Sequence, residues 1–190
     1  MKTENLQKYS DLRSSGFIHL KDFISTDEVS LLLNQWVDAS RELEAGHDTQ
    51  VPGSVSMYNF LPTTQLAVYK ASSLADILGV NLLPTYSFVR TYFSNTNLAK
   101  HRDREACEIS VSIHLDGDKD WPLYIDGNPI NLKTGDAVLY WGHDLEHWRE
   151  TYLGESYTNA FLHFIRSLGE NIGHAFDLDH LTSLRITSGQ

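Results

Sequence analysis

The chain has 190 residues, 41% of them hydrophobic and 11% aromatic, so it can bury the core of one globular domain and is not a disordered chain. Its formal net charge of −10, with 15 scattered lysines and arginines, excludes broad electrostatic binding to nucleic acid or to an anionic membrane. No apolar run approaches bilayer-spanning length, and residues 1–5 lack the apolar segment of a signal peptide, so we expect a cytoplasmic protein with a single domain over 1–190.

Residues 1–82 are expected to form a helical amino-terminal part. Within it, residues 1–15 have the apolar spacing of a short amphipathic helix, and residues 16–20 have the composition of a strand. A capping box, Ser25-Thr26-Asp27-Glu28, begins a helix that is expected to run to about Ala45. The apolar residues of this helix recur with the spacing of one buried face, at Val29, Leu32, Leu33 and Trp36.

Residues 46–62 have no periodic pattern and are expected to form a loop at the rim of the site. A second helix follows this loop and ends at Gly79. Its inward-facing residues are expected to be Leu66, Tyr69, Leu74 and Ile77. Cys107 is the only cysteine, which excludes an intrachain disulfide and a thiolate cluster, so we expect it to act as a small buried hydrophobe.

From residue 83 onward the pattern changes to short strands separated by turns that are rich in Gly, Asp and Asn. Strands are predicted near 85–93, 107–115, 121–125, 129–132, 136–141, 145–149 and 158–165. Many short strands after a helical segment indicate a mainly β fold, with a jelly-roll core over 83–168 and helices packed on one side. The tail, residues 169–190, is weakly patterned and is expected to be disordered in part.

The triplet His101-Arg102-Asp103 stands just before the strand predicted at 107–115. On a strand or at its end, residues i and i+2 point the same way, about 6–7 Å apart, so His101 and Asp103 can converge on one ion. A third ligand has to come from another strand, where His147 and His143 are the candidates. We prefer His147, because Gly142 makes the segment around His143 irregular. Two imidazoles and one carboxylate form the ligand set of a non-haem Fe(II) site that keeps open coordination positions.

The order of segments between Leu83 and Ile165 resembles that of the Fe(II)- and 2-oxoglutarate-dependent oxygenases, in particular their prolyl-hydroxylase-like branch. The similar stretches are Pro84–Tyr92, His101–Val111, Trp121–Ile125, Leu132–Asp136, Glu146–Glu150 and Phe161–Phe164, preceded by Gly16–Ile18 and Asp22–Ser25. This resemblance implies a double-stranded β-helix, which is a cupin-like jelly roll. It also implies Fe(II) as the metal, with 2-oxoglutarate and O2 as co-substrates.

The implied co-substrate needs a partner for its distal carboxylate, because an unpaired buried charge costs several kcal/mol. Relatives commonly place an Arg or Lys on the strand after the distal histidine, but here that window, residues 156–158, holds no cation. Arg149 is the first substitute, since it lies two residues after His147 on the same side of a strand. The other candidates are Arg90 with Tyr92 on the strand that precedes the motif, and the hydroxyl of Tyr157.

The implied activity is hydroxylation of an unactivated C–H bond, for which a protein or peptide side chain is the favoured substrate. The same chemistry on a free amino acid or small metabolite is the alternative. A third interpretation is a non-catalytic, cupin-like metal-binding or structural jelly roll, which the missing cation favours. Two further histidines on predicted strands, His114 and His163, are expected to be core residues with satisfied hydrogen bonds.

Overall fold

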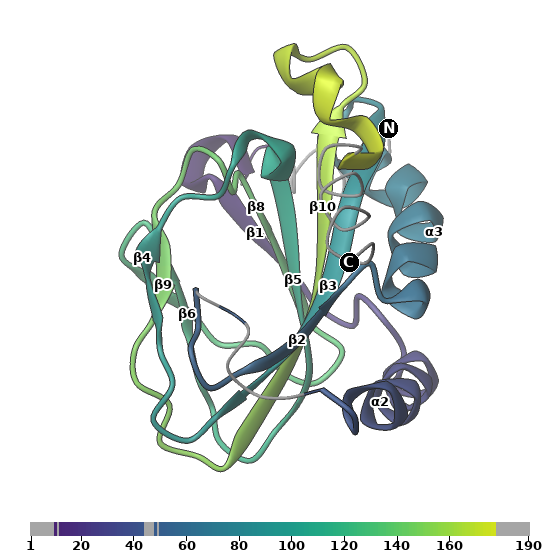
Figure 1. The fold of residues 1–190 in the computed structure, drawn as a ribbon. Coiled ribbons are helices and arrows are strands. Elements are labelled where there is room, and N and C mark those ends of the chain that lie inside the picture. Colours follow the sequence, from purple (N-terminus) through teal and green to yellow (C-terminus); the bar gives the residue numbers. More distant parts are fainter. Residues whose placement is uncertain (1–9, 11, 44–47, 49, 178–190) are drawn as a thin grey trace, which may run out of the picture.

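The computed structural model describes residues 10, 12–43, 48 and 50–177, whose strands form two antiparallel sheets that face each other (Figure 1). The larger sheet has the order β1-β8-β5-β10-β3-β2, and the smaller has the order β4-β9-β6-β7. The strands of the larger sheet are β1 (Phe17–Leu20), β2 (Val55–Tyr58), β3 (Leu82–Phe93), β5 (Ile109–Gly117), β8 (Ala137–Tyr140) and β10 (Ser156–Arg166). Those of the smaller sheet are β4 (Leu98–His101), β6 (Leu123–Ile125), β7 (Asn128–Ile130) and β9 (His147–Arg149).

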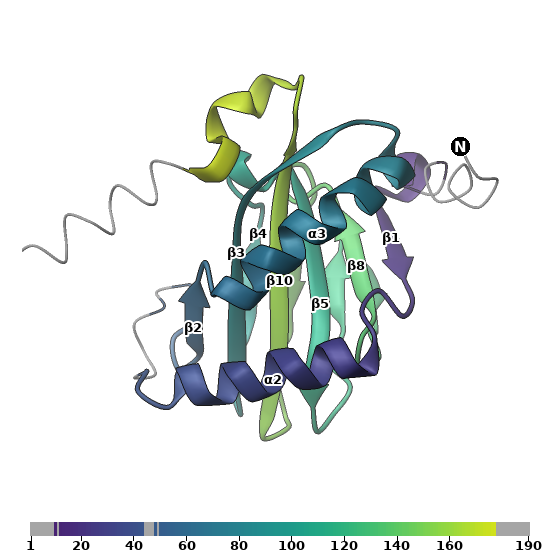
Figure 2. The same cartoon turned by 90° about the vertical axis from the view of Figure 1, so that its right-hand side faces the viewer.

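Two helices, α2 (Thr26–Ser40) and α3 (Leu61–Leu78), lie across the outer face of the larger sheet (Figure 2). The predicted capping box begins α2: the hydroxyl of Ser25 accepts from the backbone N–H of Glu28, and the Glu28 carboxylate accepts from the backbone N–H of Ser25. Gly79 ends α3 in the left-handed conformation, with φ of 69°, as a C-terminal cap.

One predicted core residue of α3 is wrong, because Tyr69 is 74% exposed. The buried stripe of the helix runs through Leu66, Leu74 and Ile77, and Lys70 takes the inward position instead of Tyr69. The Lys70 ammonium donates to the backbone oxygen of Phe23 at 2.8 Å, so its aliphatic stem can cover apolar surface at this place.

The hydrophobic core has two parts on opposite faces of the larger sheet. Between this sheet and the helices the buried side chains are mostly aliphatic. Between the two sheets they are largely aromatic and include Tyr92, Trp121, Tyr140, Tyr157 and Phe161. The layered arrangement confirms the predicted mainly β jelly roll with helices on one side. Buried polar side chains, among them Arg90, His147 and Arg149, also lie between the two sheets.

The strand predicted over residues 16–20 is β1, and the seven strands predicted after residue 83 correspond to β3 and β5–β10, with boundaries that differ by up to three residues. The loop predicted over residues 46–62 is wrong in part, because β2 pairs with the edge of β3 there. The short strand β4 was not predicted either. Both strands have only four residues, too few for a periodic pattern, and are formed by pairing with strands that lie elsewhere in the chain.

The two ends of the chain are described only in part. Of the helix predicted over 1–15, residues 1–9 and 11 lie outside the described residues, and residues 12–15 are helical. In the predicted tail, a 3-10 segment, η2 (Glu170–Asp177), packs near the upper end of β3 and β10 in Figure 1, and residues 178–190 lie outside the described residues. Among the helices described, none is both long and apolar enough to cross a membrane.

Candidate metal centre

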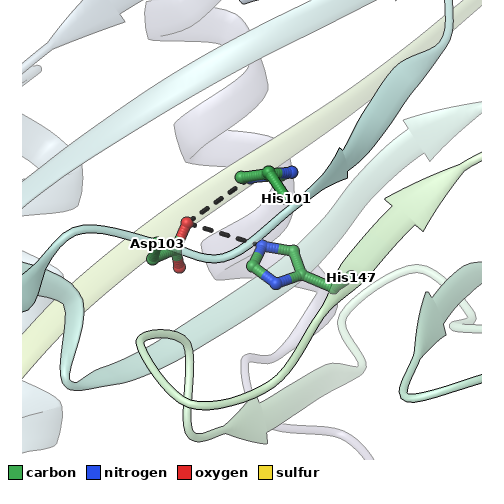
Figure 3. Close-up of side chains that lie close together, drawn as sticks. All are labelled: His101, Asp103 and His147. Carbon is green, nitrogen blue, oxygen red and sulfur yellow. Dashed lines mark ion pairs between the residues drawn. The ribbon is translucent and has the colours of Figure 1, made fainter.

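The structure brings His101, Asp103 and His147 together between the two sheets (Figure 3). His101 ends β4 and His147 begins β9, and the two are register partners in this antiparallel pair, with ring centroids 4.2 Å apart. Asp103 lies in the loop after β4, and its backbone N–H donates to the carbonyl of Gly142 at 2.9 Å. One donor atom from each residue lies within 4.8 Å of the other two, the arrangement needed to hold one ion.

The hydrogen bonds of the two histidines point their Nε2 lone pairs toward Asp103. Nδ1 of His101 lies 2.8 Å from the carbonyl of Ala99, and Nδ1 of His147 lies 3.0 Å from that of Leu145, so each Nδ1 carries the proton. The Nε2 atoms then face Oδ1 of Asp103 at 3.5 Å and 3.4 Å. One donor atom from each of the three residues thus faces the same place, so the residues fit a divalent metal.

The carboxylate of Asp103 is held in its ionised form. Burial alone would raise its pKa, but the neighbouring imidazoles of His101 and His147 outweigh burial and hold the pKa well below its ordinary value. The second oxygen, Oδ2, accepts from the hydroxyl of Ser110 at 2.8 Å. Asp103 therefore offers Oδ1 to a metal while Ser110 fixes its orientation from behind.

Gly142 leaves the space that this arrangement needs. A Cβ at this position would press against Oγ of Ser110 and Oδ2 of Asp103, and would lie 2.8 Å from the backbone oxygen of Cys107. Because Gly142 has no side chain, Asp103 and Ser110 can approach its backbone closely.

Replacing Gly142 by alanine is therefore expected to weaken Co(II) binding about 10- to 100-fold, the usual range when the support of a metal ligand is lost. Isothermal titration calorimetry with Co(II) measures this change. Gly173→Ala is the matched control, because a Cβ there meets no atom within 4 Å. Unchanged Co(II) affinity in Gly142→Ala would contradict the assigned role of this glycine.

His143, the rival ligand, is exposed and does not join the three donors. Its Nδ1 lies 3.3 Å from the backbone oxygen of Asp103, so it contacts the ligand loop from outside. Cys107 is buried, as expected, and its Sγ lies 3.0 Å from the hydroxyl of Tyr86. Burial raises the pKa of this thiol, so Cys107 is not a thiolate at neutral pH.

His163 and His114 are both buried, but the prediction that their hydrogen bonds are satisfied is wrong. Nδ1 of His163 lies 3.0 Å from Oγ of Ser110, whereas its Nε2 has no partner among the described residues. Nδ1 of His114 likewise has none there, and the face of this ring is stacked on Tyr157 at 4.3 Å. Burial lowers the pKa of His163 to about 4, so its ring is neutral at pH 7.

A pocket of about 330 Å³ opens beside the three donors. Two of the lining residues, Gln50 and Tyr58, come from the segment predicted to form the rim. The wall is largely aromatic, with Phe88 stacked on Phe161 at 4.3 Å. The predicted co-substrate residues Arg149, Arg90 and Tyr92 also line the pocket, whereas Tyr157 does not.

Arg149 is a buried guanidinium, 2% exposed, and within the described part of the chain it has no acidic partner. It donates to the backbone oxygen of Trp121 and, with the amide of Asn159 in its hydrogen-bonding orientation, to the Asn159 side-chain oxygen at 2.9 Å. It also lies over the rings of Trp121 and Tyr157, at 4.8 Å and 4.9 Å. The arginine–carboxylate pairs among the described residues do not include it: Arg41–Asp38, Arg90–Asp48, Arg104–Asp177 and Arg166–Glu108.

Arg90 differs from Arg149 because its charge is already neutralised. It pairs with Asp48, donates to Gln50 Oε1 at 3.1 Å, and has its Nη1 3.4 Å from the hydroxyl of Tyr92. Burial would raise the pKa of Asp48, but the adjacent guanidinium brings it below its ordinary value, so this pair stays charged. Of the two arginines that the sequence offers as anchors, only Arg149 lacks a counter-ion among the residues that the structure describes.

An ion pair connects the segment η2 to the loop that carries Asp103. Arg104, next to this ligand, forms a two-pronged pair with Asp177, which is 1% exposed, and also lies over the ring of Tyr86 at 4.5 Å. Phe176 and Asp177 have positive φ values of 60° and 41°, a conformation that non-glycine residues rarely adopt. The last described turn of the chain thus holds part of the pocket wall.

The sequence did not reveal the roles of several residues that contact the candidate metal ligands or the two pocket arginines: Asp48, Gln50, Ser110, Gly142 and Asn159. For Ser110 a signal existed, because it follows the ligand motif on an alternating strand and faces inward. Asp48 and Gln50 come from a segment without any periodic pattern, so nothing in the sequence indicates which way their side chains point.

The comparisons place this geometry among known folds. Neither the protein-family models nor the curated proteins compared with the chain match its sequence. Solved structures do match: a prolyl-4-hydroxylase from Pseudomonas putida is 17% identical, with a TM-score of 0.67 over 85% of this chain and 98% of that one. A prolyl hydroxylase from Trichoplax adhaerens, in complex with a peptide fragment of hypoxia-inducible factor, is 15% identical, with a TM-score of 0.65 over 86% and 94%.

A third match is HygX from Streptomyces hygroscopicus, with nickel, 2-oxoglutarate and hygromycin B bound. It is 12% identical, with a TM-score of 0.68 over 88% of each chain. At such low identities the similarity shows the fold alone. This fold is the one implied by the order of sequence segments between Leu83 and Ile165. The chain has the fold of the Fe(II)- and 2-oxoglutarate-dependent oxygenases, prolyl-4-hydroxylases among them.

Proposed function

We propose that the protein is an Fe(II)- and 2-oxoglutarate-dependent dioxygenase that hydroxylates an unactivated C–H bond. The observation that carries this proposal is the meeting of His101, Asp103 and His147 beside a pocket that is also lined by the buried guanidinium of Arg149. Two imidazoles and one carboxylate leave further coordination positions of an Fe(II) ion open. When bound, iron, 2-oxoglutarate and O2 supply the oxidising chemistry, which yields succinate, CO2 and a hydroxylated substrate.

Arg149 is proposed to bind the distal carboxylate of 2-oxoglutarate. It follows His147 by two residues on β9, about 6–7 Å along the strand, so a short dicarboxylate can reach from the metal position to the guanidinium. The buried guanidinium gains a counter-ion when this carboxylate arrives, which offsets the cost of keeping both charges away from water. Tyr92 lines the same pocket and offers a second donor, while Tyr157 packs against Arg149 and holds it in place.

The non-catalytic interpretation rests on the missing cation at residues 156–158. Arg149 removes the reason for this interpretation, because it provides a cation in the pocket from β9. Asp103 favours hydroxylation over halogenation, because halogenases of this superfamily have a small residue in place of the carboxylate ligand, which admits a halide. The structure-based proposal therefore remains hydroxylation.

The proposed substrate is a protein or peptide side chain. The pocket reaches the surface, since Tyr58 and Arg102 line it and are both exposed, so a chain laid across this mouth can insert one side chain. The Trichoplax neighbour binds a peptide, which agrees with this proposal. HygX binds hygromycin B, and hydroxylation of a small molecule is accordingly the second candidate.

The activity is tested by measuring succinate formed from 2-oxoglutarate after addition of Fe(II) under air. We expect turnover by the wild type and loss of at least about 1,000-fold in His101→Ala, because the remaining two donors hold iron poorly. His143→Ala is the matched control, since this histidine is exposed beside the same loop and does not join the donors. A wild type that binds neither Fe(II) nor 2-oxoglutarate would refute the proposed function.

A further inference from the structure

Gln50 touches the atom of His101 that a metal would need. Its side chain lines the pocket, and its Nε2 lies 3.0 Å from Nε2 of His101. At the other end of the carboxamide, Oε1 accepts from Nη2 of Arg90 at 3.1 Å. The amide therefore bridges a guanidinium and a candidate metal ligand.

The orientation of this amide follows from its two partners. A guanidinium can only donate hydrogen bonds, so the oxygen of Gln50 has to face Arg90 and its NH2 group has to face His101. The Nδ1 proton of His101 is taken by the carbonyl of Ala99, at 2.8 Å, so Nε2 carries a lone pair. Gln50 thus donates a hydrogen bond to the very lone pair through which His101 would coordinate a metal.

The guanidinium behind Gln50 is buried and paired. Arg90 is 1% exposed and is paired with Asp48, whose carboxylate also accepts from the hydroxyl of Ser56 at 3.0 Å. This network holds the oxygen end of the amide at Arg90, which places the NH2 end beside His101. Gln50 is an exposed residue that lines the pocket, so its NH2 group lies where it can donate to an oxygen atom of a ligand on the metal.

We propose that Gln50 is a ligand-binding residue with two partners: it covers Nε2 of His101 in the metal-free protein, and it donates to an oxygen atom of metal-bound 2-oxoglutarate in the loaded protein. This inference rests on the proposed function and adds a residue that selects between the two states. In the first state Gln50 opposes metal binding, and in the second it favours the co-substrate. Loss of the amide therefore has effects of opposite sign on the two ligands.

The test measures both affinities of Gln50→Ala by calorimetry, first with Co(II) alone and then with 2-oxoglutarate added to Co(II)-loaded protein. We expect Co(II) to bind about fivefold more tightly, because a competing hydrogen bond is gone, and 2-oxoglutarate to bind about five- to tenfold more weakly. Gln50→Met, which keeps the length of the side chain but has no donor, is expected to behave in the same way.

Gln65→Ala on α3 is the matched control, since this glutamine is exposed and does not line the pocket, and both of its affinities should equal those of the wild type. Weakening of both ligands in Gln50→Ala would indicate a merely structural role and overturn the inference, as would two unchanged affinities. A wild type that binds Co(II) but not 2-oxoglutarate would refute the proposed function and the loaded-state role of Gln50. Tighter Co(II) binding by Gln50→Ala in that case would still support its metal-free contact.

Discussion

Arg149→Gln is expected to weaken the binding of 2-oxoglutarate about 100-fold and to leave the Co(II) affinity within about threefold of the wild type. Truncating one member of a buried, hydrogen-bonded charge pair costs about 2–5 kcal/mol, and every 1.4 kcal/mol is about tenfold in affinity. Glutamine keeps a donor for the backbone oxygen of Trp121, which limits the structural damage. Calorimetry with Co(II)-loaded protein measures the affinity, and the co-substrate concentration that half-saturates the succinate assay should rise in parallel.

Two variants separate this role from a general loss of positive charge. Arg166→Gln removes an arginine that pairs with Glu108 away from the pocket, and should leave the affinity for 2-oxoglutarate unchanged. Arg90→Gln changes the other pocket arginine, whose charge Asp48 already neutralises, and should weaken co-substrate binding less than about tenfold. If Arg90→Gln had the larger effect of the two pocket variants, the anchor would be Arg90.

The metal-free protein is expected to lose about 3 kcal/mol of stability through His163 between pH 6.5 and pH 4. Burial lowers the pKa of this histidine to about 4 in the folded state, whereas an unfolded histidine titrates near 6.5. As the pH falls, the unfolded chain takes up the proton first. Above pH 6.5, His163 is neutral in both states and does not lower the free energy of unfolding. This free energy then decreases progressively as the pH falls toward 4.

His163→Gln cannot be protonated at this position, so its free energy of unfolding should fall less steeply with acidification. Urea unfolding of both proteins at pH 7 and pH 4, after removal of metal with a chelator, gives the two differences to be compared. The exposed His143, replaced by glutamine, is the control and should keep the pH dependence of the wild type. Parallel pH profiles of His163→Gln and wild type would show that the ring is protonated without cost.

The short spacing between His101 and Asp103 explains why the cluster of candidate metal ligands could be predicted. His101 and Asp103 are close in sequence, and only one further strand had to be chosen for the third donor. The irregularity that Gly142 introduces was the reason to prefer His147 over His143. In the structure this same glycine provides the space for Asp103, a role that depends on contacts with Ser110 and Cys107 from other elements. Such long-range contacts leave no periodic trace in a single sequence.

The choice between the two arginines could not be made from the sequence for a similar reason. Arg149 was a candidate because it lies two residues after His147 on the same side of a strand, and Arg90 because it shares a face with Tyr92 on the strand that precedes the motif. What distinguishes them is Asp48, whose carboxylate neutralises Arg90 from a segment that has no regular pattern. The position of that carboxylate is set by tertiary structure alone, and so is the contact between Gln50 and His101.

The ion pair between Arg104 and Asp177 has a consequence for folding during synthesis. The two residues are 73 positions apart, and Asp177 belongs to the last turn that the structure describes. During synthesis the loop that carries Asp103 and Arg104 emerges from the ribosome well before Asp177 does. The pocket wall can be completed only after β10 and η2 have been translated, so a nascent chain that already carries His101, Asp103 and His147 still lacks a finished pocket.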